Sequence, residues 1–238
     1  PNHADTHNNL GNALRQAGDL SASIDAFNKA LSLNPNFTDA HKNLGKALLE
    51  QGDLTAAVAS FSTALTLNLN DPGSYNNLGI AYSEKGDLAA AIHSYEKALS
   101  LNANLIDAHN NLGVALKTQG NIGAAIHSFN KALSINPEHP EAYNNLVTIL
   151  KDNGKLEEAE IWSKQCLLFR PEYATLYNNF GATCQALGRL AEAKKQLKHA
   201  SIIDPGYITV FWNLIGLEKT IAGAESQIDR CLSIDGNF

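Results

Sequence analysis

Apolar and polar residues follow a helical pattern along most of this chain. Around residue 78, the apolar residues Tyr75, Leu78, Gly79 and Tyr82 have the i, i+3, i+4, i+7 spacing that lines one face of an α-helix. The stretch 88–99 has the same spacing. The pattern predicts a pair of amphipathic helices of about 14 residues, each roughly 21 Å long.

This pair of helices recurs every 34 residues, a period that is typical of a stacked array of repeats. We number the positions of each copy from its first residue. The copies span 4–37, 38–71, 72–105, 106–139, 140–173 and 174–207, with a partial copy over 208–238. We therefore expect one continuous array over 1–238. Because the chain opens and closes at the same phase of the repeat, we interpret it as a piece of a longer protein.

Turn residues separate the expected helices. Glycine can adopt a left-handed conformation without steric penalty, so it is predicted to end the first helix of six copies. These glycines are Gly18, Gly52, Gly86, Gly120, Gly154 and Gly188. The next residue can cap the second helix in four copies, at Asp19, Asp53, Asp87 and Asn121. Prolines are expected to end several second helices, at Pro35, Pro137, Pro171 and Pro205.

Small residues mark the places where helices are expected to approach closely, such as Gly79 and Ala98. The fifth and sixth copies depart from this pattern. In the fifth copy Val147 replaces the glycine and Ser163 replaces an aromatic residue, so we expect Trp162 to fill the lost volume. At position 21, where the other copies have an aliphatic residue, these two copies have Glu160 and Lys194.

The recurring residues resemble the tetratricopeptide repeat. The likeness consists of His or an aromatic residue at position 4, Leu at 7, Gly at 8, Ala at 20, an aromatic residue at 24, Ala at 27 and Pro at 32. It covers nearly the whole chain. The resemblance implies an all-α fold, an α-solenoid of antiparallel helix pairs that forms a right-handed superhelix. It also implies that the first helices line a concave groove that binds peptide segments of partner proteins.

Asparagine is the best candidate for a binding residue. The sixth-position asparagines occur in all seven copies: Asn9, Asn43, Asn77, Asn111, Asn145, Asn179 and Asn213. The fifth-position asparagines occur in five: Asn8, Asn76, Asn110, Asn144 and Asn178. A carboxamide both donates and accepts hydrogen bonds, so each could bind one peptide unit. At ~3.3 Å per residue, an extended ligand would span one repeat with about three residues.

Two further interpretations stay open. The family pattern itself favours asparagine at the sixth position, so a plain scaffold would also carry it. The groove is also similar to that of the repeat arm of O-linked N-acetylglucosamine transferases, where asparagines bind the substrate backbone. The alternative function is therefore a substrate-recruiting arm of a larger glycosyl-, methyl- or sulfo-transferase.

Other residues on the expected groove could tune it. Position 2 is acidic at Asp5, Asp39, Asp107 and Glu141, and position 12 is basic at Arg15, Lys117, Lys151 and Lys219. Ile80, Val114 and Trp212 could make apolar contacts. Co-chaperones of this family clamp a carboxylate with further cations. Starting from Lys42, those places hold Asp107 and Asn111, so that activity is not predicted.

Composition narrows the function further. The net charge of −6 and the pI near 5.7 disfavour nucleic-acid binding, and no apolar run approaches the ~20 residues that span a membrane. The histidines at position 4 are expected to pack, and the three cysteines fall at core positions. We predict neither catalysis nor a cofactor nor a metal site. We expect a cytoplasmic module with a protein or peptide partner, open to end-to-end self-association.

Overall fold

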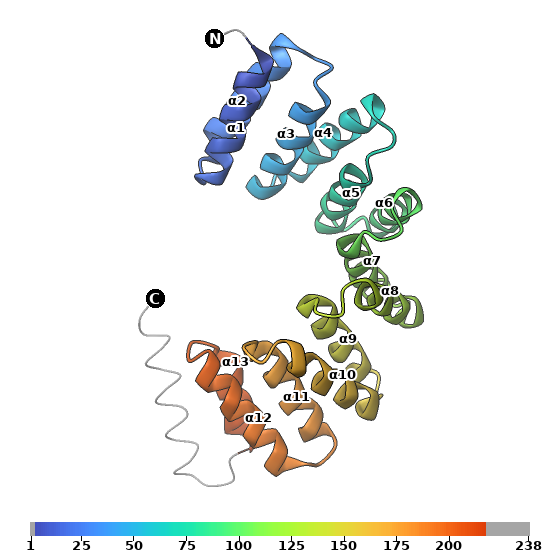
Figure 1. Ribbon diagram of the computed structural model, residues 1–238, viewed down its shortest axis with the longest axis vertical. Coiled ribbons are helices and arrows are strands. Elements are labelled where there is room, and N and C mark those ends of the chain that lie inside the picture. Colours follow the sequence, from blue (N-terminus) through green and yellow to red (C-terminus); the bar gives the residue numbers. More distant parts are fainter. Residues whose placement is uncertain (1–2, 218–238) are drawn as a thin grey trace. The chain divides into compact units, whose positions relative to one another are not determined.

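The computed structural model describes residues 3–217, and this part of the chain contains helices and turns but no strand (Figure 1). Residue contacts divide the chain into two units, 1–132 and 133–238. The first unit contains α1 (Ala4–Gln16), α2 (Leu20–Leu33), α3 (Thr38–Gln51), α4 (Leu54–Leu67), α5 (Pro72–Glu84), α6 (Leu88–Leu101), α7 (Ile106–Thr118) and most of α8 (Ile122–Ile135). The second contains the end of α8 and then α9 (Pro140–Asp152), α10 (Leu156–Phe169), α11 (Ala174–Ala186), α12 (Leu190–Ile203) and α13 (Ile208–Leu217).

The turn inside each pair forms as the sequence predicts. All six expected glycines have positive φ, between 73° and 89°. In the first four pairs the following side chain caps the second helix. Asp19, for example, accepts a hydrogen bond from the Ala22 N–H at 3.0 Å, and Asn121 accepts one from Ala124 at 3.3 Å. In the next two pairs Lys155 and Arg189 occupy the same place and make no capping bond.

In the first four copies the two helices of a pair meet at a contact between a glycine and an aromatic ring. The ring of Phe61 on α4 lies so close to Gly45 on α3 that an added Cβ atom would be 2.7 Å from its Cε1 atom. The same contact joins Gly11 to Phe27, Gly79 to Tyr95 and Gly113 to Phe129. The alanines that recur every 34 residues on the second helices, Ala30, Ala64, Ala98 and Ala132, are also buried. The prediction of close helix approach is therefore confirmed at the glycines.

The fifth copy reverses the sizes of this contact. Val147 on α9 takes the place of the glycine and Ser163 on α10 takes the place of the ring, and both are 1% exposed. The missing volume on the second helix is thus matched by added volume on the first. The ring of Trp162 packs on that of Tyr143, with the ring centroids 5.8 Å apart.

The first helices of consecutive pairs form a continuous layer within each unit. In the first unit α1 contacts α3, α3 contacts α5, and α5 contacts α7; in the second unit α9 contacts α11. Within a unit a second helix packs against its own first helix and the next one, as α4 does against α3 and α5 and as α10 does against α9 and α11. Figure 1 shows the first helices α1, α3 and α5 following one another in the first unit. Equivalent positions of these helices are therefore expected to stand in line.

Candidate functional site

The geometry of the first helices sets the direction in which each asparagine side chain points. At 3.6 residues per turn, the sixth position lies about 200° around the helix from the glycine that faces the second helix. A sixth-position side chain therefore points away from its own partner helix. The fifth position lies only about 60° from the glycine and points toward the neighbouring repeat.

Hydrogen bonds join the two sets of asparagines between neighbouring repeats. A sixth-position Nδ2 group donates to the fifth-position Oδ1 atom of the preceding copy. Asn43 donates to Asn8 at 2.9 Å, Asn111 to Asn76 at 3.2 Å, Asn213 to Asn178 at 2.7 Å, and Asn179 to Asn144. Partners are 35 residues apart in every case, so the same offset sets the register at each of these junctions.

The two sets differ in exposure. The fifth-position residues Asn8, Asn76 and Asn178 are only 7%, 8% and 5% exposed. Asn110 and Asn144 are partly buried. Asn9 is exposed, and the other six sixth-position asparagines are partly buried. The fifth-position side chains thus lie between helices, whereas the sixth-position side chains reach the surface of the layer.

The pattern is interrupted between the second and third copies. Lys42 stands at the fifth position there, and its ammonium group contacts the Asp71 carboxylate at 2.9 Å and that of Asp39 at 3.5 Å. Asp71 also accepts hydrogen bonds from the Gly73 N–H at 3.1 Å and the Ser74 hydroxyl at 2.8 Å. An ammonium group cannot accept a hydrogen bond, so Lys42 cannot replace asparagine in the junction.

Both members of this ion pair are held in their charged forms. Partial burial lowers the pKa of Lys42, but the hydrogen bond and charge of Asp71 outweigh it and raise the pKa above its ordinary value. Burial raises the pKa of Asp71, but hydrogen bonds from Lys42 and Ser74 outweigh this effect and lower it overall. Lys42 therefore keeps a fixed place beside Asp71 at neutral pH.

Charged and apolar residues flank the asparagines. The acidic residues at position 2, Asp5, Asp39, Asp107 and Glu141, are exposed. Arg15 at position 12 pairs with Glu50 of the next copy at 2.6 Å, also 35 residues away. Ile80 is partly buried, Val114 is 37% exposed and Trp212 is 56% exposed. Lys219 lies outside the described residues.

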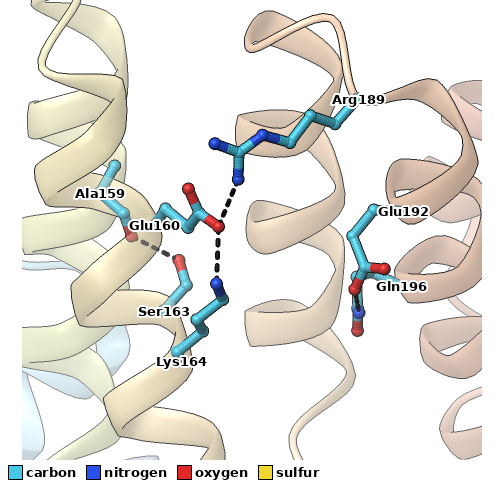
Figure 2. Close-up of polar contacts among 7 residues, drawn as sticks. All are labelled: Ala159, Glu160, Ser163, Lys164, Arg189, Glu192 and Gln196. Atoms are coloured by element: carbon cyan, nitrogen blue, oxygen red, sulfur yellow. Dashed lines mark hydrogen bonds and ion pairs between the residues drawn. The ribbon is translucent and has the colours of Figure 1, made fainter.

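A second polar cluster occupies the fifth and sixth copies. Figure 2 shows the Glu160 carboxylate of α10 between Lys164 on the same helix and Arg189, which directly precedes α12. Its Oε1 atom is 2.7 Å from the Lys164 Nζ atom and 2.6 Å from the Arg189 Nη1 atom. The hydrogen bond from Lys164 lowers the pKa of Glu160; burial opposes this, and the charges of Lys164 and Arg189 favour it, so that the pKa lies below its ordinary value.

Several histidine and cysteine side chains are held by hydrogen bonds or are buried in the core. His41 and His109 each place Nε2 within 2.9 Å of a carbonyl oxygen in the preceding turn, on Pro35 and Ala103 respectively. Cys166 and Cys184 are buried, and burial raises the pKa of their thiols to about 12 and about 11. Cys231 lies outside the described residues. Residues 3–217 contain no group of three or more His, Cys, Asp or Glu side chains that could hold a metal ion.

Sequence reasoning missed two uses of asparagine. One is the bond between the sixth and fifth positions, whose only sequence signal is their recurrence 35 residues apart. The other is a turn after the second helices, where Asn34, Asn68, Asn102 and Asn136 accept a hydrogen bond from the N–H two residues later. Asp204 makes the same bond, while Arg170 interrupts the series.

Within residues 3–217, these features define an all-α helical-repeat protein, in which paired helices are stacked within each unit. In this part of the chain no helix is both long and apolar enough to cross a membrane.

Family models identify the repeats. A model described as "TPR repeat" matches residues 11–52, 45–86 and 81–120. Models described as "Tetratricopeptide repeat" match residues 106–139, 128–161 and 174–207. The chain belongs to the tetratricopeptide repeat family. No curated protein matches its sequence.

Solved structures have the same fold. The crystal structure of MamA is similar over 68% of this chain and 95% of its own, with 28% identity and a TM-score of 0.64. YrrB, whose structure is titled "a TPR protein with an unusual peptide-binding site", covers 79% of this chain and 97% of its own at 24% identity, with a TM-score of 0.62. The C-terminal part of a TPR repeat-containing protein from Cytophaga hutchinsonii covers 97% of this chain and 96% of its own at 16% identity, with a TM-score of 0.75.

Proposed function

We propose that this protein binds extended segments of partner proteins along the sixth-position asparagines of its first helices. Membership of the tetratricopeptide repeat family supports the general role, a scaffold for protein–protein interaction.

The bond between sixth- and fifth-position asparagines is the observation that carries this proposal. When Asn111 donates one Nδ2 hydrogen to Asn76, its carboxamide is held in one orientation. Its Oδ1 atom and its second N–H group remain available on the surface of the layer. A binding group that is already oriented loses less conformational entropy when a ligand arrives.

The spacing of the row suits a main chain. Packed helices lie about 8–10 Å apart, so successive first helices offer a carboxamide at roughly every third residue of an extended peptide. Carboxamides that bond a backbone recognise conformation more than sequence. We therefore expect a ligand that is extended and rich in small or polar residues, held by several weak contacts in series.

The twelve candidate asparagines have two separate roles, one in binding and one in positioning. The sixth-position set contacts the ligand. The fifth-position set, with Asn8, Asn76 and Asn178 buried, positions the first set and does not itself touch the ligand.

A peptide-display experiment tests the proposal. The full chain is used to select from a random dodecapeptide library, and the enriched peptides are then measured by fluorescence anisotropy. The variant Asn43→Ala/Asn77→Ala/Asn111→Ala should bind these peptides at least about tenfold more weakly, because three contacts are lost together.

The matched control changes asparagines on second helices. Asn28 on α2 and Asn130 on α8 are exposed, so Asn28→Ala/Asn130→Ala should bind as the parent protein does. Thermal melts must show that both variants are folded. Equal binding by the parent protein and the triple variant would overturn the proposal.

A further inference from the structure

One sixth-position asparagine of the first unit differs from its neighbours. Asn77 on α5 faces Lys42 on α3, where the other junctions of this type have a fifth-position asparagine. Lys42 has no acceptor to offer and is held by Asp71 at 2.9 Å. Among residues 3–217 the Asn77 carboxamide has no hydrogen-bond partner, so both of its N–H groups and its oxygen are available.

A cation lies on the same surface. Lys46 is one helical turn beyond Lys42 on α3, so the two side chains share a face of that helix. Lys46 is partly buried, and in the described part of the chain no carboxylate pairs with it. By contrast, Arg15 is paired with Glu50 and Lys42 with Asp71.

The register of the junction brings these groups together. A residue of α3 lies opposite the residue of α5 that is 35 positions later, as Arg15 of α1 lies opposite Glu50 of α3. Asn77 is therefore opposite Lys42, and Lys46 is one turn further along the same side. Ile80, three residues after Asn77, is on the same face of α5 and is partly buried.

We infer that the junction between the second and third copies is the specificity-determining subsite of the proposed binding face, and that it takes one acidic residue of an extended segment. The inference rests on the proposed function. The Asn77 carboxamide bonds the N–H and C=O of one peptide unit, and the Lys46 ammonium pairs with the aspartate or glutamate side chain. Ile80 contacts the methylene groups of that side chain.

Neighbouring charges limit the ligand to an isolated acidic residue. The oxygens of Asp71 are occupied by Lys42, Gly73 and Ser74, so Asp71 does not compete for Lys46. The side chain of Asp39, about two turns before Lys46 on α3, is 68% exposed and disfavours further acidic residues there. With a net charge of −6, the protein as a whole disfavours a strongly acidic segment.

The test uses the same random dodecapeptide library with three proteins: the parent chain, Lys46→Gln and Lys97→Gln. Lys97 is exposed on the second helix α6 and serves as the matched control. We expect peptides selected by the parent chain and by Lys97→Gln to carry one enriched Asp or Glu position. Peptides selected by Lys46→Gln should lack that enrichment.

A selected peptide then provides a double-mutant cycle. Changing its acidic residue to the amide should weaken binding to the parent chain by roughly fivefold to tenfold. The same change should alter binding to Lys46→Gln by less than about twofold, because the cation is already absent.

The outcomes separate the two proposals. Enriched peptides without an acidic preference, or a preference that survives Lys46→Gln, overturn the acidic subsite and leave the proposed function standing. If the parent chain enriches no peptide over Asn43→Ala/Asn77→Ala/Asn111→Ala, the proposed function fails and the subsite falls with it.

Discussion

The contact between Gly45 and Phe61 allows a quantitative test of how the helix pairs close. In Gly45→Val the new Cβ atom would lie 2.7, 2.8 and 2.9 Å from three ring carbons of Phe61. The ring is fully buried among Leu44, Ala47 and Ala57, so it has no space into which to move. Overpacking of this kind costs about 1–3 kcal/mol. Helix propensity alone would make valine slightly better than glycine, so the sign of the effect reports on the contact.

The second change removes the ring. Phe61→Ser alone should cost about 3–5 kcal/mol, as for other large-to-small changes in a core. Combined with Gly45→Val it reproduces the natural pair Val147 and Ser163 of the fifth copy. Since the valine then meets no ring, the double variant should be more stable than the sum of the single changes predicts, by about 2 kcal/mol.

Urea unfolding followed by far-ultraviolet circular dichroism measures all four proteins of this cycle. The control cycle combines Gly45→Val with Phe129→Ser, a ring that packs on Gly113 in another copy. These two changes should add to within about 0.5 kcal/mol. Additive effects of Gly45→Val and Phe61→Ser, or a harmless Gly45→Val, would show that the proposed packing is wrong.

Three further predictions concern local features. Asp53→Ala removes the cap on the Ala56 N–H and should lower the free energy of unfolding in urea by about 1 kcal/mol. Lys155→Ala removes no capping bond and should change this free energy little. Equal losses in the two variants would contradict the role of the cap. Because the folded-state pKa of Glu160 lies below the ordinary value of 4.5, its stabilisation is present above that pH and is lost as the pH falls through the folded-state pKa. Glu160→Gln should therefore be less stable than the parent chain at pH 7 by about 1 kcal/mol, and this difference should shrink as the pH falls below 4.5. A difference that does not depend on pH would refute this. In a Cys231→Ser variant the buried thiols of Cys166 and Cys184 should not react with a disulfide reagent at pH 8 until guanidinium unfolds the chain; rapid reaction of the folded protein would show that they are accessible.

The fold was predictable because its signals are local and repeated. A helical apolar pattern, a glycine with positive φ and a capping Asp each specify a structure within a few residues, and the period repeats them. The glycine–aromatic contact was also foreseeable, since only a small residue allows the ring of Phe61 to lie against α3. The exchange of sizes at Val147 and Ser163 was harder to predict, because it depends on which two side chains meet across the pair.

The sequence predicted that the asparagines share a surface, but not which of them are buried or which bond to one another. Sequence period places Asn76 and Asn77 on one helix, but it does not say that Asn76 is buried and Asn77 is partly exposed. That difference comes from the offset of neighbouring first helices, which no single repeat contains. The consequence of Lys42 was missed for the same reason, since its effect falls on Asn77 in the next copy.

The constant offset at the junctions also bears on how such a chain can change length. Loss of residues 38–71 would make the first and third copies neighbours and would set Asn77 against Asn8, a donor beside a suitable acceptor. At the asparagine junction, recombination in steps of one whole repeat therefore preserves the pairing of donor and acceptor. Lys42 marks the second copy as distinct in this series, so such an event would erase the one junction that breaks the pattern.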